Sequence, residues 1–127
     1  MTSRQQILEE WYREQAAYFF TTEAHRVAGL LGVSVRKVAI GTYRTQWGSC
    51  SAKGRLAFNA RLIFAPRWVA EYVVVHEVVH LVHHNHSKQY WAVVGKLYPN
   101  YKEARRWLRH NARNLLVPRT FIPLAHS

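Results

Sequence analysis

The run HEVVHLVHHNH, residues 76–86, places five histidines and one glutamate in an otherwise valine-rich segment. By residue propensity alone, the valines favour a β-strand. The segment from Pro66 to about residue 84 is, however, about 18 residues long, far longer than the usual strand. Pro66 suits the first turn of a helix, and a helix that is apolar on nearly all sides is typical of a buried one. The sequence therefore predicts a buried helix over residues 66–84.

On such a helix, His76 and His80 lie one turn apart and about 40° from each other around the axis, so both imidazoles can reach one ion. Glu77 is one step further, which places its carboxylate beside the ion without binding it. A base in that position can take a proton from metal-bound water. A strand would send Glu77 to the opposite face. The H-E-x-x-H pattern of residues 76–80 therefore predicts two metal ligands and a general base.

His86 is the candidate for a third ligand. It follows Asn85, where the helix is expected to end, and the chain can turn back there to bring a third nitrogen to the ion. The fourth position is then left for water, as in catalytic zinc sites. We therefore predict that His76, His80 and His86 bind Zn²⁺.

Two further histidines allow other interpretations. His80 and His84 form a rival pair four residues apart, but Leu81 follows His80 where a carboxylate would be needed, so that pair would hold a structural or adventitious metal. His83 is interpreted as a hydrogen-bonding partner near the ligands or as part of a half-exposed helix end.

Composition predicts one soluble domain over residues 1–127, because this length suits a single core and 49% of the residues are hydrophobic. Cys50 is the only cysteine, which excludes an internal disulfide and fits a reducing compartment. The first residues lack the apolar segment of a signal peptide, and the apolar run Val73–Val75 stops at His76. We therefore expect a cytoplasmic protein that does not interact with membranes.

The formal charge of +11, from 18 Lys and Arg against seven Asp and Glu, favours polyanionic partners such as nucleic acid or nucleotides. A set of five basic residues shares one side of a helix predicted over residues 101–116, and it is interpreted either as a phosphate-contacting face or as an ordinary solvated surface. These residues are Lys102, Arg105, Arg106, Arg109 and Arg113.

Periodicity and turn residues predict the remaining elements. The first part of the chain is predicted to form one or two helices over residues 3–31, with Ser3 as cap and an end near Gly29 or Gly32. A strand over 33–45 follows, and then a hairpin that turns at Gly54 and continues over 55–62. After the histidine segment we expect a helix from Ser87 to Tyr98 and the 101–116 helix, before a tail that contains Pro118 and Pro123.

Three stretches carry a family resemblance that covers nearly the whole chain. They are WYREQA (11–16), RTQWGSCSAKGRLAFNARLIFAPRWVAEYVVVHEVVHLVHHNHSKQYW (44–91) and YPNYKEARRWL (98–108). In these stretches the sequence resembles the YgjP-like metallopeptidases, zincins that are related to the SprT-like and WLM proteases. The combination of WGSCS, H-E-x-x-H and NHS is specific.

The resemblance implies an α+β, zincin-like domain. A small mixed or antiparallel sheet packs on the helix that carries H-E-x-x-H, N- and C-terminal helices flank it, and the strand near residues 55–63 borders the cleft. It also implies that His76, His80 and His86 bind zinc and that Glu77 is the base. The spacing is similar to the metzincin pattern H-E-x-x-H-x-x-G-x-x-H, except that His83 stands at the glycine position.

The resulting hypothesis is zinc-dependent hydrolysis of peptide bonds by water that Glu77 activates. Tyr90 and Arg44 are candidates to stabilise the oxyanion, although both are also explained by packing or surface roles. The segment Trp47–Cys50 is interpreted either as the cleft floor or as ordinary packing. Two alternatives remain: a metal-dependent nucleotide pyrophosphatase, for which carboxylate ligands would be expected, and a nucleic-acid-binding module with a structural zinc.

Overall fold

Helix α2 (Arg67–Val79) lies at the centre of the computed structural model, which describes residues 3–116. It contacts α1 (Arg4–Leu31), α3 (Lys88–Leu97), α4 (Tyr101–Leu116) and two strands of the sheet. Six valines of α2 are almost completely buried, and they occupy several sides of the helix: Val69, Val73, Val74, Val75, Val78 and Val79. The predicted buried helix is confirmed, because contacts on all sides offset the low helix propensity of valine.

The predicted end of this helix, near residue 84, is wrong. After Val79 the backbone changes to tighter turns, in which the N–H of His80 donates to Glu77 O at 3.2 Å and that of Leu81 to Val78 O at 2.9 Å. Val82 is already 42% exposed, so another helical turn would gain little apolar contact. The chain instead reverses between residues 80 and 87.

The sheet has three strands in the order β1-β3-β2. The first strand, β1 (Lys37–Gly41), pairs in parallel with β3 (Arg55–Asn59), whereas β2 (Gly48–Cys50) pairs antiparallel with β3. The sheet is therefore mixed, the predicted hairpin around Gly54 is confirmed, and the first strand is shorter than the predicted 33–45.

The strand predicted over 55–62 also stops early, at Asn59. The side chain of Asn59 is completely buried and accepts a hydrogen bond from the N–H of Arg61 at 3.0 Å, which caps a 3-10 helix, η1 (Ala60–Phe64). Its amide group also donates to the carbonyls of Tyr43 and Gln46 at 2.8 and 2.9 Å. The two bonds to the carbonyls fix the loop that leads into β2.

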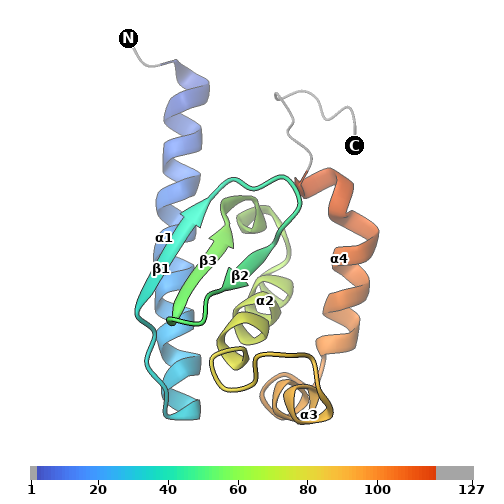
Figure 1. Ribbon diagram of the computed structural model, residues 1–127. Coiled ribbons are helices and arrows are strands. Elements are labelled where there is room, and N and C mark those ends of the chain that lie inside the picture. Colours follow the sequence, from blue (N-terminus) through green and yellow to red (C-terminus); the bar gives the residue numbers. More distant parts are fainter. Residues whose placement is uncertain (1–2, 117–127) are drawn as a thin grey trace.

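One face of the sheet packs on the helices. Leu56 and Phe58 point to this face, and Phe58 stacks on Phe20 of α1 with ring centroids 4.7 Å apart. Figure 1 shows the sheet in front of α1 and α2, with its other face uncovered by any helix. The strand that borders α2 at the sheet edge is β2. The expectation that the strand near 55–63 borders the cleft is therefore wrong, because β3 lies between the other two strands.

The helix boundaries follow local capping. At the start of α1, Ser3 and Gln6 form a capping box, and the helix ends at Gly32, which has a left-handed conformation (φ 69°) that glycine adopts without strain. Ser87 caps α3 by accepting from the N–H of Tyr90. Pro118 and Pro123 lie outside the described residues. Within residues 3–116, no helix has both the length and the apolar character needed to span a membrane.

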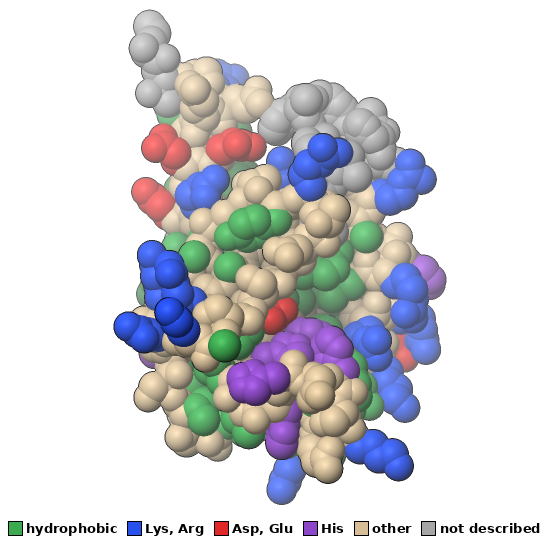
Figure 2. Space-filling model, viewed as in Figure 1, with side chains coloured by type: hydrophobic (Ala, Val, Ile, Leu, Met, Phe, Trp, Pro, Cys, Tyr) green, Lys and Arg blue, Asp and Glu red, His purple; other side chains and the backbone are tan. Residues whose placement is uncertain are grey.

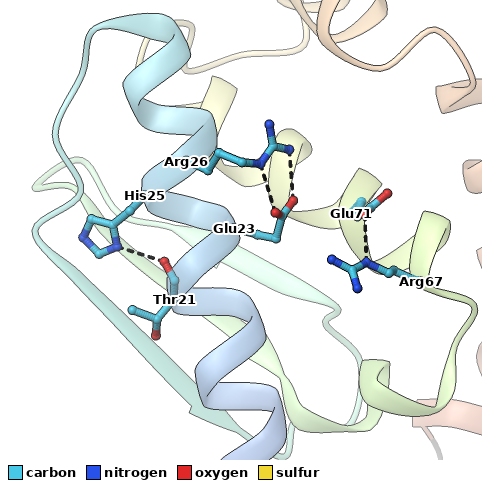
Figure 3. Close-up of polar contacts among 6 residues, drawn as sticks. All are labelled: Thr21, Glu23, His25, Arg26, Arg67 and Glu71. Carbon is cyan, nitrogen blue, oxygen red and sulfur yellow. Dashed lines mark hydrogen bonds and ion pairs between the residues drawn. The ribbon is translucent and has the colours of Figure 1, made fainter.

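Two ion pairs lie along the boundary between α1 and α2 (Figure 3). Arg26 donates two hydrogen bonds of 3.0 Å to the carboxylate of Glu23, which is only 8% exposed. On α2, Arg67 donates to Glu71 at 3.0 Å. The bidentate pair compensates for the burial of Glu23 and so allows a charged residue on the packed side of α1.

We expect Phe20→Ala to lower the free energy of unfolding by about 3–5 kcal/mol, since it removes a fully buried ring and leaves a cavity beside Phe58. Tyr18→Ala is the matched control on the same helix, because Tyr18 is 76% exposed. Urea denaturation followed by circular dichroism measures both changes. Equal effects of the two substitutions would contradict the assignment of the core.

Candidate metal centre

Helix α2 brings His76 and Glu77 to its last turn, and His80 follows directly as the residue that caps the helix. His76 and His80 are half-buried, with ring centroids 5.2 Å apart, whereas Glu77 is only 6% exposed. The predicted spacing along the helix therefore places both imidazoles together, with the carboxylate beside them.

The chain reversal after α2 returns His86 to the same place. The Nε2 atoms of His80 and His86 are 3.0 Å apart, and the ring of His86 lies 5.2 Å from that of His76. One nitrogen from each of His76, His80 and His86 can be chosen so that all lie within 4.8 Å of one another. The structure thus groups the three histidines that the sequence singled out.

Hydrogen bonds at the other ring nitrogens orient two of these imidazoles. Nδ1 of His80 lies 3.1 Å from the carbonyl oxygen of His83, so it donates its proton there and leaves the lone pair on Nε2. Nδ1 of His76 lies 3.0 Å from the hydroxyl of Tyr72, one turn earlier on α2. Metal-ligating histidines commonly have such partners, which fix the ring and its tautomer.

Sequence reasoning missed the role of Tyr72. The signal was available, because Tyr72 precedes His76 by four residues and therefore lies on the same side of the helix. His83 was expected to act through its side chain as a hydrogen-bonding partner. In the structure, its backbone carbonyl makes the contact with the candidate ligand His80.

Tyr90 of α3 packs against two of the candidate ligands, His76 and His80. It is completely buried, its hydroxyl donates to the backbone carbonyl of His76 at 2.8 Å, and its ring stacks on His80 with centroids 4.6 Å apart. These contacts fit its interpretation as a core residue better than that as an oxyanion stabiliser. Arg44 is exposed in the loop before β2 and does not line the hollows that border His76 and Glu77.

A hollow of about 270 Å³ opens beside the imidazoles. It is lined by residues of β2, of α2 and of the following loop: Gly48, Cys50, His76, Glu77, His80 and His84. His84 is exposed and borders this hollow, but it does not belong to the three-histidine group. Of the segment Trp47–Cys50, Gly48 and Cys50 therefore form part of the cleft wall.

Gly48 makes room for the carboxylate. A Cβ atom at this position would lie 3.0 Å from Cγ of Glu77 and 3.0 Å from the carbonyl oxygen of Ala57, closer than such contacts normally are. No hydrogen bond or ion pair to the Glu77 carboxylate occurs within residues 3–116. The carboxylate thus faces the hollow with its oxygens available to a ligand or to water.

Burial shifts the charge states of these groups toward their neutral forms. It raises the pKa of Glu77 to about 7. Burial, followed by the neighbouring His80, His86 and Arg105, lowers the pKa of His76 to about 3. His76 is therefore a neutral imidazole at physiological pH, which is the form that binds metal.

Cys50 is not activated. Burial, together with the nearby Glu77, raises the pKa of its thiol to about 11, and the thiol donates to the carbonyl of Ser51 at 3.5 Å. A thiol that stays protonated is a poor nucleophile. Cys50 therefore serves as a small side chain in the wall of the hollow.

Basic residues lie along the side of the molecule formed by α4, next to the histidines (Figure 2). The five basic residues of the predicted face are all exposed. Arg106 pairs with Glu103 at 2.8 Å, whereas Arg105 places its guanidinium 4.5 Å from the ring centre of Trp91.

Comparison with known proteins gives a family and a fold. The sequence profile of the family described as "YgjP-like, metallopeptidase domain" matches residues 1–111. The crystal structure of the metallopeptidase zymogen of Pyrococcus abyssi abylysin is similar, with a TM-score of 0.65 and 22% identity over 76% of this chain and 98% of that chain. A comparison with curated proteins finds no match. The α+β, zincin-like fold expected from the sequence is thereby confirmed.

We predict that His86→Ala abolishes stoichiometric zinc binding, because two imidazoles leave the ion too open, whereas His84→Ala keeps about one zinc per chain. Elemental analysis after dialysis against a weak chelator measures the content. Loss of zinc from the His84 variant, with retention in the His86 variant, would favour the rival pair of His80 and His84.

We predict that Gly48→Ala lowers the free energy of unfolding by about 1–3 kcal/mol, since the new methyl group overlaps Glu77 and the backbone of Ala57. Gly29→Ala is the control, because a Cβ atom there meets nothing within 4 Å and a helical alanine is favoured over glycine. Urea denaturation distinguishes them. A fully tolerated Gly48→Ala would show that the carboxylate is not confined by β2.

Proposed function

The chain belongs to the family of YgjP-like metallopeptidase domains, and we propose that it is a zinc peptidase in which His76, His80 and His86 hold the ion and Glu77 is the general base. The observation that carries this proposal is the arrangement at the end of α2. One nitrogen from each of three imidazoles lies within 4.8 Å of the others, and the carboxylate of Glu77, which has no hydrogen-bonding partner among the described residues, lines a hollow together with His76 and His80.

The donor set fits zinc. Neutral imidazoles are preferred zinc ligands, and the second nitrogens of His76 and His80 already have hydrogen-bonding partners. No carboxylate belongs to the three-histidine group within the described residues, and a Mg²⁺-dependent phosphohydrolase would need oxygen ligands. When bound, zinc lowers the pKa of water and polarises a carbonyl oxygen.

Glu77 transfers the proton of the attacking water to the leaving amine. Its carboxylate faces the hollow from the buried side, and Gly48 leaves it room there. It accepts the proton of the attacking water and later returns it to the amine of the departing peptide. The position of the carboxylate, beside the imidazoles and at the wall of the hollow, allows it to reach both the water and the departing amine.

The free edge of β2 offers a place for the substrate. This strand pairs with β3 on one side only among the described residues, and Gly48 and Cys50 line the hollow. An extended peptide that adds to this edge by backbone hydrogen bonds would bring its carbonyl groups beside the imidazoles.

The single free thiol, Cys50, is compatible with a cytoplasmic location.

Glu77→Gln tests the proposal. We expect it to keep about one zinc per chain and to reduce peptide hydrolysis by about 10²–10⁴-fold, because the amide preserves the shape but cannot accept the proton. Glu71→Gln is the control on the same helix, since Glu71 pairs with Arg67 away from the hollow. Cleavage of unstructured casein-like peptides measures activity.

The same zinc-loaded samples are assayed with nucleoside triphosphates. Phosphate or pyrophosphate release without peptide cleavage would contradict the proposal and favour the nucleotide alternative. Full peptidase activity in Glu77→Gln would remove Glu77 from the mechanism.

A further inference from the structure

A second, larger hollow adjoins the candidate metal centre. It has a volume of about 490 Å³ and shares His76 and Glu77 with the hollow at the imidazoles. It therefore begins where the reacting bond would lie and extends toward α4. Its walls come from the loop before β2, from the first residue of β2, from α2 and from α4, and they include Trp47, Val73, Arg105, Leu108 and Arg109.

The chemistry of this hollow is uneven. Trp47, Val73 and Leu108 give it an apolar wall, whereas α4 contributes two guanidinium groups, Arg105 and Arg109, from successive turns. The only acidic residue in the lining is Glu77, at the end shared with the metal centre. A ligand that enters the hollow thus meets Glu77 at the end next to the imidazoles and a cationic wall on the side of α4.

Arg105 is held in place without a carboxylate partner. Its guanidinium lies 4.5 Å from the centre of the Trp91 ring, and Trp91 in turn stacks on Tyr101 with centroids 5.3 Å apart. Within residues 3–116, neither Arg105 nor Arg109 forms an ion pair, whereas the adjacent Arg106 pairs with Glu103. The stacking orients Arg105 and leaves its N–H donors available to another group.

We propose that Arg105, supported by Arg109, selects peptide substrates that place a carboxylate in this second hollow, beside the bond that is cleaved. This inference rests on the proposed peptidase function and adds a substrate class to it. A guanidinium group recognises a carboxylate through two parallel hydrogen bonds, and the adjacent apolar wall reduces the competition from water. A lysine side chain in the hollow would be repelled by both arginines.

The carboxylate has two sources in peptides: an Asp or Glu side chain, or the C-terminal end of the chain. Both present the same group to Arg105, so the hollow alone recognises either. Peptides that differ only in these features distinguish the two sources.

Binding to the Glu77→Gln variant tests the inference independently of turnover. Fluorescence anisotropy measures the affinity of labelled peptides that carry one Glu, Gln or Lys at successive positions, each with a free or an amidated C-terminus. We expect a peptide with a carboxylate at one position to bind about tenfold more tightly than its neutral counterpart. Weaker binding of every peptide after amidation identifies the C-terminal carboxylate as the recognised group. Tighter binding of the Glu peptide than of the Gln peptide, with or without amidation, identifies the side chain.

Substitutions at α4 then assign the preference. Adding Arg105→Gln to Glu77→Gln should reduce the difference between the acidic and neutral peptides to less than about twofold, and Arg105→Glu should favour the lysine peptide. Arg106→Gln is the control, because it removes the same charge from the next position of the helix, outside the hollow. Circular dichroism confirms that each variant is folded.

Equal losses in the Arg105 and Arg106 variants would overturn the inference, and so would binding that depends neither on an acidic side chain nor on a free C-terminal carboxylate. So would a nucleoside triphosphate that displaces acidic peptides and depends on Arg105, since the hollow would then serve phosphate. Failure of the proposed function is a separate result: wild-type protein would cleave no peptide, while the preference in binding persisted.

Discussion

The burial of α2 on nearly all of its sides is the constraint on which the rest of the structure depends. A valine-rich segment has little tendency to remain helical by itself, so the helix relies on neighbours that cover each side. Those neighbours are also what builds the candidate site. The edge strand β2 contributes Gly48, α3 contributes Tyr90, and α4 contributes Arg105. Core packing and site geometry are therefore coupled.

The same burial explains how the polar groups at the end of α2 are used. Nδ1 of His76, Nδ1 of His80 and the hydroxyl of Tyr90 each have a partner within the protein. What remains for a ligand is the pair of Nε2 atoms of His80 and His86, which lie 3.0 Å from each other, and the carboxylate of Glu77. Because unsatisfied polar groups are costly in a packed interior, those that are left facing a hollow indicate where a ligand is expected.

Much of this arrangement could be predicted from the sequence, because it depends on local spacing. The interval of four residues between His76 and His80 specifies a shared side of a helix, and Ser3, Gly32 and Ser87 mark helix ends through capping. The return of His86 was predicted from its distance along the chain, although the helix ends earlier than expected. The reversal starts at His80 because the segment beyond Val79 has too little apolar surface to bury.

The rest depends on long-range contacts that no local pattern encodes. The parallel pairing of β1 with β3 leaves β2 at the sheet edge beside α2, and in this order Gly48 lies against Glu77. Arg105 likewise looked like one member of a basic helix face. Its distinction from Arg106 arises from the packing of α4 beside Trp91.

Zinc K-edge X-ray absorption of the metal-loaded protein tests the central claim most directly. The account predicts three imidazole nitrogens and one oxygen at about 2.0–2.1 Å from the ion and no sulfur ligand. A sulfur at about 2.3 Å would place Cys50 in the coordination sphere, and a count of two imidazoles would remove one of the three histidines. Either result would contradict the centre described for the end of α2.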